Sequence, residues 1–104
     1  PAVCFKINRA WSKNMTKEQL YNSIRGTWYL SLSRASKAEY GIGLCYGIIR
    51  GIYKIEGWET DYERSPIRHR FYGFEAQELQ KYLGYNMLNH PGHKVRGPLF
   101  YNEC

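Results

Sequence analysis

Cysteine is scarce in this sequence, and the three cysteines that it has form no close pair. Cys4, Cys45 and Cys104 are odd in number and lie far apart along the chain. Disulfide frameworks use an even number of cysteines, and structural zinc sites use closely spaced cysteine pairs, so the sequence favours neither. We expect Cys4 and Cys45 to be small core residues and Cys104 to carry a free thiol. Such cysteine use fits a reducing, cytoplasmic protein.

Long apolar runs are also absent. No hydrophobic stretch approaches the length of about 20 residues that spans a bilayer, so we expect no signal peptide and no membrane partner. His90 and His93 lie three residues apart in a Pro-Gly loop, but no third metal ligand accompanies them. We therefore expect neither a metal nor a cofactor.

Signatures of catalysis are missing as well. The sequence contains no glycine-rich phosphate loop, no serine nucleophile elbow and no cysteine–histidine signature. Its nine acidic residues show no pair with a spacing that suits acid–base catalysis. The run Gly51-Ile52-Tyr53 copies the first tripeptide of GIY-YIG nucleases, but the second tripeptide does not follow it. We therefore predict a protein that is not an enzyme.

Positive charge and aromatic rings are what the sequence has in excess. Fifteen lysines and arginines against nine acidic residues give a net charge of +6, and 16% of the residues are aromatic. A positive surface attracts polyanions, although it also serves solubility alone. Aromatic rings beside basic groups suit a ligand with a phosphate and a flat base, so we expect a nucleotide or nucleic-acid partner. The tyrosine-rich surface would also tolerate a homodimer.

The amino-terminal part of the chain predicts a strand followed by a helix. Residues 2–8 are rich in β-forming side chains and are bounded by polar residues. Thr16 and Gln19 have the spacing of a capping box, which predicts a helix that begins at Thr16. Gly26 is a plausible end of that helix.

The middle of the chain predicts one short helix and then strongly bent strands. After an extended segment over residues 27–30, Ser33 is expected to cap a helix over residues 34–40. The run 40–58 is apolar and β-branched and contains too many glycines for a helix. Its glycines predict bulges or sharp bends between strands.

The remaining elements complete an α+β pattern. We expect, in order, a polar loop over 59–66, a strand over 67–74, a helix over 75–83 with Leu79, Tyr82 and Leu83 inward, a loop over 86–97 and a strand over 99–102. This order predicts one α+β domain over residues 1–104, with a small, highly curved sheet and two or three short helices.

The first group of candidate ligand-binding residues surrounds the expected short helix and consists of Arg25, Trp28, Ser31, Ser33, Arg34 and Lys37. Free backbone N–H groups at a helix start near Ser33 would suit an anion. Arg34 and Lys37 are three residues apart and can share one helix face. A core position for Trp28, and a solvated face for Arg34, are the alternatives.

Two further groups lie on expected strands, namely Tyr46, Arg50, Tyr53, Lys54 and Trp58 on one and Arg68, Arg70 and Tyr72 on the other. An open face with basic and aromatic side chains is how small barrels hold bases and phosphates. Two arginines on one face could clamp a phosphate. The alternatives are that Trp58 closes the end of the barrel and that Arg68 and Arg70 form only a solvated face opposite the core.

Several short motifs are spread over nearly the whole chain, namely Leu20-Tyr21, Arg25-Gly26 with Trp28, Arg34-Ala35 with Lys37-Ala38-Glu39-Tyr40, Gly47-Ile48-Ile49, Gly51-Ile52-Tyr53-Lys54-Ile55 with Trp58, Phe71-Tyr72-Gly73-Phe74 and Gly97-Pro98-Leu99-Phe100-Tyr101-Asn102. With these motifs the chain resembles a family of small bacterial and phage domains that is similar to the PUA-like superfamily, which includes the ASCH, EVE and YTH modules. The resemblance implies a strongly curved β-barrel flanked by helices, with a pocket for a nucleobase or nucleotide. Some members of that family are fused to nucleases.

The leading functional interpretation is a non-enzymatic module that binds RNA, DNA or a nucleotide. Its phosphate would meet Arg25, Arg34 and Lys37, and its base would stack on Trp28, Tyr53 or Trp58. Two alternatives remain open. One is a phage counter-defence protein that sequesters a cyclic nucleotide immune signal, and the other is a nucleic-acid or nucleotide hydrolase that uses Glu39 and Glu56.

Overall fold

Residues 1–91 and 97–102, which the computed structural model describes, form five strands and three short helices. The strands are β1 (Ala2–Lys6), β2 (Tyr40–Cys45), β3 (Ile48–Asp61), β4 (Arg68–Glu75) and β5 (Leu99–Asn102). The helices are α1 (Lys17–Arg25), α2 (Leu32–Ala35) and the 3-10 helix η1 (Gln77–Tyr82).

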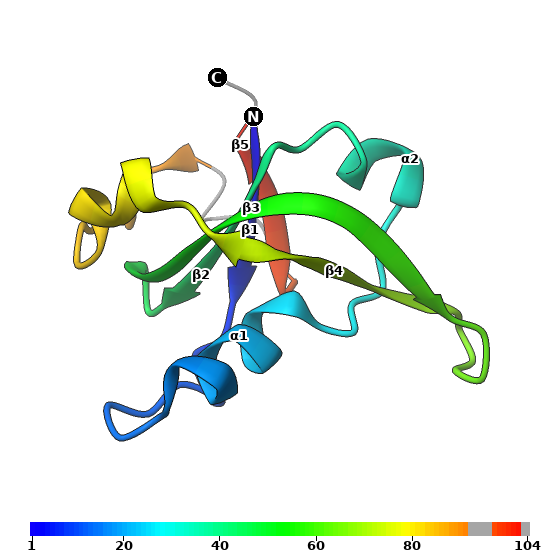
Figure 1. The fold of residues 1–104 in the computed structure, drawn as a ribbon. Coiled ribbons are helices and arrows are strands. Elements are labelled where there is room, and N and C mark those ends of the chain that lie inside the picture. Colours follow the sequence, from blue (N-terminus) through cyan, green and yellow to red (C-terminus); the bar gives the residue numbers. More distant parts are fainter. Residues whose placement is uncertain (92–96, 103–104) are drawn as a thin grey trace.

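All five strands belong to one mixed sheet in the order β4-β3-β2-β1-β5 (Figure 1). β1 runs parallel to β2, and the other neighbouring strands are antiparallel. The predicted α+β class is therefore confirmed. The expected barrel is not confirmed, because β4 and β5 are two separate edges of an open sheet among the described residues. β5 has only four residues and pairs with β1, which leaves the curved sheet unclosed.

The long strand β3 bends at its bulges, as its glycines predict. Its pairing with β2 shifts register after Gly43, and its pairing with β4 shifts between Ile55 and Gly57. β3 and β4 together form a long curved ribbon (Figure 1). At Gly73 the neighbouring strand comes so close that a Cβ atom would lie 1.9 Å from the Lys54 carbonyl oxygen. Only glycine fits there, so the close pairing of β3 with β4 depends on it.

The first helix follows the prediction, whereas the second is shifted. Thr16 caps α1 through the expected capping box, and Gly26 ends the helix with φ +108°. The N-cap of α2 is Ser31 and not Ser33, because the Ser31 hydroxyl accepts the Arg34 N–H. The predicted helix over 34–40 is wrong, since α2 ends at Ala35 and β2 begins at Tyr40.

Two later boundaries also differ from the expectation. The polar loop predicted over residues 59–66 begins later in the structure, because residues 59–61 continue β3 and pair with residues 68–70 of β4. The expected helix over 75–83 is the 3-10 helix η1, and its first residue, Glu75, belongs to β4. Leu79 points inward as expected, but Tyr82 and Leu83 are exposed. The Gln80 side chain donates to the carbonyls of Ile52 and Ala76, which ties this tight turn to the sheet.

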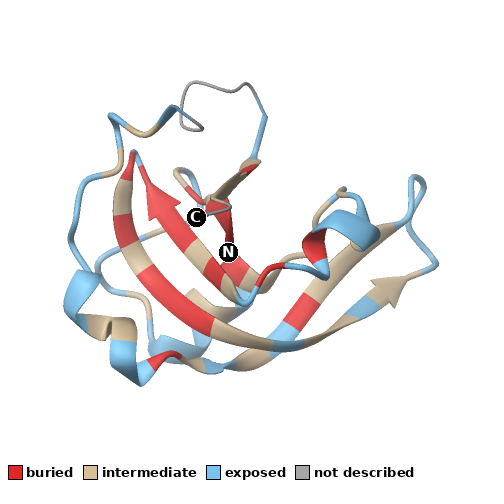
Figure 2. Cartoon of the chain, turned by 90° about the horizontal axis from the view of Figure 1, so that it is seen from above, coloured by how far each residue is buried: buried red, intermediate tan, exposed pale blue. Residues whose placement is uncertain are grey.

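The core lies on both faces of the sheet because strand side chains alternate. Val3 and Phe5 pack on one face with Ile24 of α1, whereas Cys4 packs on the other with Leu44 and residues near η1. Figure 2 shows the buried residues along the strands in the middle of the sheet. Cys4 and Cys45 are buried as expected, and burial raises the pKa of Cys4 to about 12. Cys104 lies outside the described residues.

The outer edge of β4 is covered by residues of α1 and of the segment after it. Trp28 and His69 exchange two backbone hydrogen bonds of 2.7 and 2.9 Å. The Arg25 Nε donates to the Phe71 carbonyl at 2.9 Å, and the Gly73 N–H donates to the Tyr21 hydroxyl at 3.0 Å. His69, Phe71 and Gly73 are alternate residues of β4, and their backbone N–H and C=O groups point away from β3. The edge that an open sheet would otherwise present is therefore occupied.

We expect Tyr21→Phe to lower the free energy of unfolding by about 1 kcal/mol, because the Gly73 N–H loses its acceptor while the ring stays in the core. Urea denaturation followed by fluorescence measures this change. Tyr62→Phe is the matched control, since Tyr62 is 79% exposed in the hairpin loop. Equal stabilities of the two variants would contradict the edge-capping role of the Tyr21 hydroxyl.

Candidate functional site

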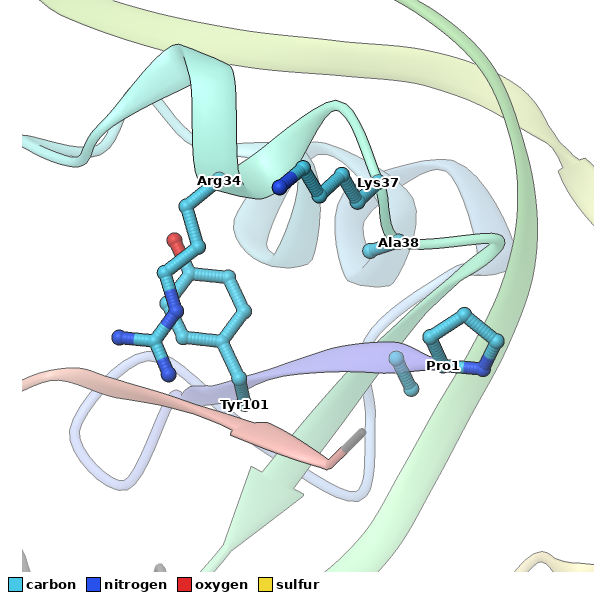
Figure 3. A pocket seen from close by; sticks show the side chains of 6 residues that line it. Pro1, Arg34, Lys37, Ala38 and Tyr101 are labelled. Carbon is cyan, nitrogen blue, oxygen red and sulfur yellow. The ribbon is translucent and has the colours of Figure 1, made fainter. Parts of the chain in front are cut away.

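A pocket of about 460 Å³ lies between the end of α2 and the start of β1, and it brings Arg34 and Lys37 together with Tyr101 of β5 (Figure 3). Pro1, Ala2 and Ala38 complete its lining. The pocket therefore has two cationic side chains, one aromatic ring and a small apolar floor. Its volume falls in the ordinary range of small-molecule sites, about 300–1,000 Å³.

Local turns fix the two cations. Ser31 caps α2, and the Lys37 N–H donates to the Arg34 carbonyl at 3.2 Å in the turn that follows the helix. Ser31 and Ser33 bond to each other through their hydroxyls at 3.1 Å. With only four residues, α2 is too short to act as the anion-binding helix start that the sequence suggested. Its two serines thus organise the turn, and the side chains of Arg34 and Lys37 supply the positive charge.

The Arg34 guanidinium lies over the Tyr101 ring, with 4.0 Å between Cζ and the ring centroid. This stacking holds a flexible cation flat against an aromatic face. Burial raises the pKa of the Tyr101 phenol, and the nearby Arg34 opposes that rise. Tyr101 was not among the candidate site residues. The only sequence signal for it was its place in the Gly97–Asn102 motif, because a contact across 67 positions (34 to 101) leaves no local pattern.

Arg25 and Trp28 of the first predicted group do not line this pocket. Arg25 holds the β4 edge, and its guanidinium forms a 2.8 Å ion pair with Glu59. Trp28 stacks on Phe5 with 4.8 Å between ring centroids, and its indole N–H donates to the Ile24 carbonyl. These contacts match the alternative in which Trp28 is a core residue. Trp28 also lines a second, more open hollow beside Lys6 and Arg9.

The predicted aromatic residues of β3 lie against the core. Tyr53 is 5% exposed and packs on Tyr21 and Phe71. Trp58 is half-buried with its ring edge-on to Phe71, and its indole nitrogen is closed to solvent without a partner among the described residues. Neither ring reaches the Arg34 pocket.

The two arginines of β4 are half-buried at the hairpin end of the sheet. Arg70 lies 3.6 Å from the Asp61 carboxylate across the β3–β4 pair. Arg68 is the register partner of the same Asp61. This carboxylate offsets part of their positive charge, and the structure does not bring either arginine to the pocket.

Glu39, one of the two acids considered for a hydrolase, is held in an ion pair. Its carboxylate accepts a short hydrogen bond from the Lys54 ammonium, and that bond lowers the pKa of Glu39 below its usual value. Next to it, the Tyr40 hydroxyl donates to Glu78 at 3.1 Å, which raises the pKa of Tyr40. A carboxylate with a lowered pKa is a poor general base near neutral pH. Glu56, the other acid, is exposed on β3.

We expect Lys54→Met to raise the pKa of Glu39, because the substitution removes the cation that favours the carboxylate. Since the folded pKa is lowered, the ion pair stabilises the protein above the usual carboxyl range, and this contribution is lost as the pH falls through the folded pKa. NMR titration of the Glu39 side-chain carbon measures the shift. Lys13→Met, an exposed loop variant, should leave it unchanged, and an equal shift in both variants would contradict the assignment.

The described residues were also searched for metal-ligand clusters and for helices that could span a membrane. Residues 1–91 and 97–102 contain no cluster of three or more histidine, cysteine or acidic side chains that could hold a metal. His90 stacks on Phe100 with 5.3 Å between ring centroids, and His93 lies outside the described residues. In the described part of the chain, each helix is too short or too polar to cross a bilayer.

The chain was also compared with models of protein families, with curated proteins and with solved structures, and no match was found in any of the three.

Proposed function

We propose that this protein is a non-enzymatic module that binds a phosphate-bearing ligand, a nucleotide or a nucleic acid, in the pocket of Arg34, Lys37 and Tyr101. The observation that carries the proposal is the convergence of two cations and an aromatic ring on one hollow of about 460 Å³. We also propose that the curved sheet with flanking helices is a PUA-like fold, which the motif resemblance and the mixed sheet support.

The two cations suit different parts of a phosphate. A guanidinium is a planar fork of donors that matches two phosphate oxygens, and the stacking of Arg34 on Tyr101 reduces the freedom that this side chain would lose on binding. Lys37, in the turn that follows α2, adds a point charge beside Arg34 (Figure 3). No ion pair joins Lys37 to another residue in the described ranges, so its charge is available to a ligand.

The rest of the pocket suits the uncharged part of a nucleotide. Ala2 and Ala38 are buried small residues, and Pro1 adds an apolar ring. A base could lie against this floor or on the outer face of the Arg34 guanidinium, since bases stack on arginine planes as well as on aromatic rings. A pocket bounded on several sides favours a small nucleotide or one flipped-out base over a long strand of nucleic acid.

We expect Arg34→Ala and Lys37→Ala each to weaken binding about ten-fold or more, since a hydrogen bond to a charged group contributes about 1.5–3 kcal/mol. A thermal-shift panel of mononucleotides, cyclic nucleotides and short oligonucleotides identifies the ligand, and calorimetry then measures affinity. The matched controls are Arg64→Ala in the hairpin loop and Lys13→Ala in the loop before α1, both exposed.

The salt dependence separates the two kinds of ligand. A single buried phosphate gives affinity that changes little with salt, whereas a polymer that contacts several phosphates loses affinity steeply. Equal losses in the pocket variants and the two controls would mean attraction by net charge alone. Unchanged affinity in folded Arg34→Ala and Lys37→Ala would place the ligand elsewhere.

A further inference from the structure

Arg50 occupies the bulge between β2 and β3. Gly43 pairs with Gly51 and Leu44 pairs with Ile49, so Arg50 has no partner across the strand pair. A bulge redirects the side chain of its extra residue, and bulges often lie next to functional sites. The sequence had marked Arg50 as part of a basic and aromatic strand, but the Arg34 pocket does not use it.

The guanidinium of Arg50 is fixed in place and incompletely bonded. It lies over the Trp11 ring with 4.1 Å between Cζ and the ring centroid. Its Nε is closed to solvent and has no hydrogen-bond partner among residues 1–91 and 97–102. A buried donor without an acceptor is costly, and a ligand oxygen would meet this guanidinium first at its terminal nitrogens, which are not closed to solvent in the same way.

Arg50 also lines a small cleft of about 170 Å³. Its lining residues are Lys17, Leu20, Arg50, Gly51, Ile52, Tyr53, Glu75, Gln80 and Leu83. Burial raises the pKa of Tyr53 to about 12, so its hydroxyl stays protonated and can donate. Arg50, Lys17 and Tyr53, three residues with donor groups, therefore line one narrow space.

We propose that this cleft binds a single phosphate group, either free or at the end of a larger molecule. Its volume is less than half of the 460 Å³ of the Arg34 pocket and lies below the ordinary range of small-molecule sites, about 300–1,000 Å³, so it suits one tetrahedral oxyanion better than a whole nucleotide. An arginine edge and a lysine are the usual pair for phosphate oxygens. The cleft shares no lining residue with the Arg34 pocket, so it is a separate site and does not depend on the function proposed there.

Glu75 is the one acidic residue in the cleft lining, and it sets the strength of the site. Its carboxylate lies 3.8 Å from the Lys17 ammonium, and the Lys17 side chain is 89% exposed. This long, solvated ion pair leaves Lys17 able to turn toward a phosphate. Removal of the Glu75 charge should therefore tighten phosphate binding, whereas a change at Arg50 should weaken it.

The test is an NMR titration with inorganic phosphate at constant ionic strength, with chloride as the replaced anion. The side-chain Nε–Hε signal of Arg50, assigned by its loss in Arg50→Lys, should shift and saturate. Arg50→Lys keeps the net charge but loses the planar fork, and we expect at least a ten-fold loss of affinity. Glu75→Gln should bind phosphate several-fold more tightly, and Glu63→Gln, which makes the same charge change in the exposed hairpin loop, should bind as the wild type.

A second titration with glycerol 3-phosphate distinguishes the sources of the phosphate. Saturation by both compounds supports a site for free phosphate, and saturation by glycerol 3-phosphate alone supports a site for the end of a larger molecule. An Arg50 signal that neither compound moves would overturn the proposal. So would equal phosphate affinities of Glu75→Gln and Glu63→Gln, a comparison that stands even if Arg50→Lys does not fold.

Discussion

The backbone polar groups on the outer edge of β4 need partners, and the way in which they find them organises much of this molecule. His69, Phe71 and Gly73 turn their polar groups away from β3, and the chain from α1 to Trp28 supplies the bonds. This arrangement holds α1 under the curved ribbon of β3 and β4 (Figure 1). It also fixes where the chain leaves α1 toward α2. The position of the Arg34 pocket therefore depends on a set of hydrogen bonds at the far edge of the sheet.

Arginine has two different uses in this protein, and the fold around each arginine explains the difference. Arg25 and Arg34 both lie beside aromatic rings in a basic stretch of sequence, yet Arg25 bonds to a strand edge and to Glu59, while Arg34 lines an open pocket. Each arginine stacks on a tyrosine ring, Arg25 on Tyr21 and Arg34 on Tyr101. For Arg25 the fold places two acceptors nearby, the Phe71 carbonyl and the Glu59 carboxylate, and both come from strands more than 30 residues away.

The expected elements that were correct are those with strong local signals. The Thr16–Gln19 capping box, the β-forming run at residues 2–8 and the glycine-rich bends each act over a few residues. The errors lie where a tertiary contact overrides a local preference. Residues 59–61 extend β3 because β4 pairs with them, and residues after Ala35 leave the helix because Tyr40 must join the sheet. Tyr53 is an aromatic residue near basic side chains, which predicts a ligand contact, but its ring fills the core between Tyr21 and Phe71.

The sequence by itself determined the α+β class, the excess of positive charge and aromatic rings, and Arg34 with Lys37 as neighbouring cations, because composition and short-range spacing carry these properties. Only the tertiary structure decided that Tyr101 stacks on Arg34 and that Arg50, at a bulge, stacks on Trp11 and lines a narrow cleft. It also decided that the sheet stays open. The physical reason is that pockets, register and edge pairing arise from contacts between distant segments, whose geometry follows from packing of the whole chain and not from any local pattern.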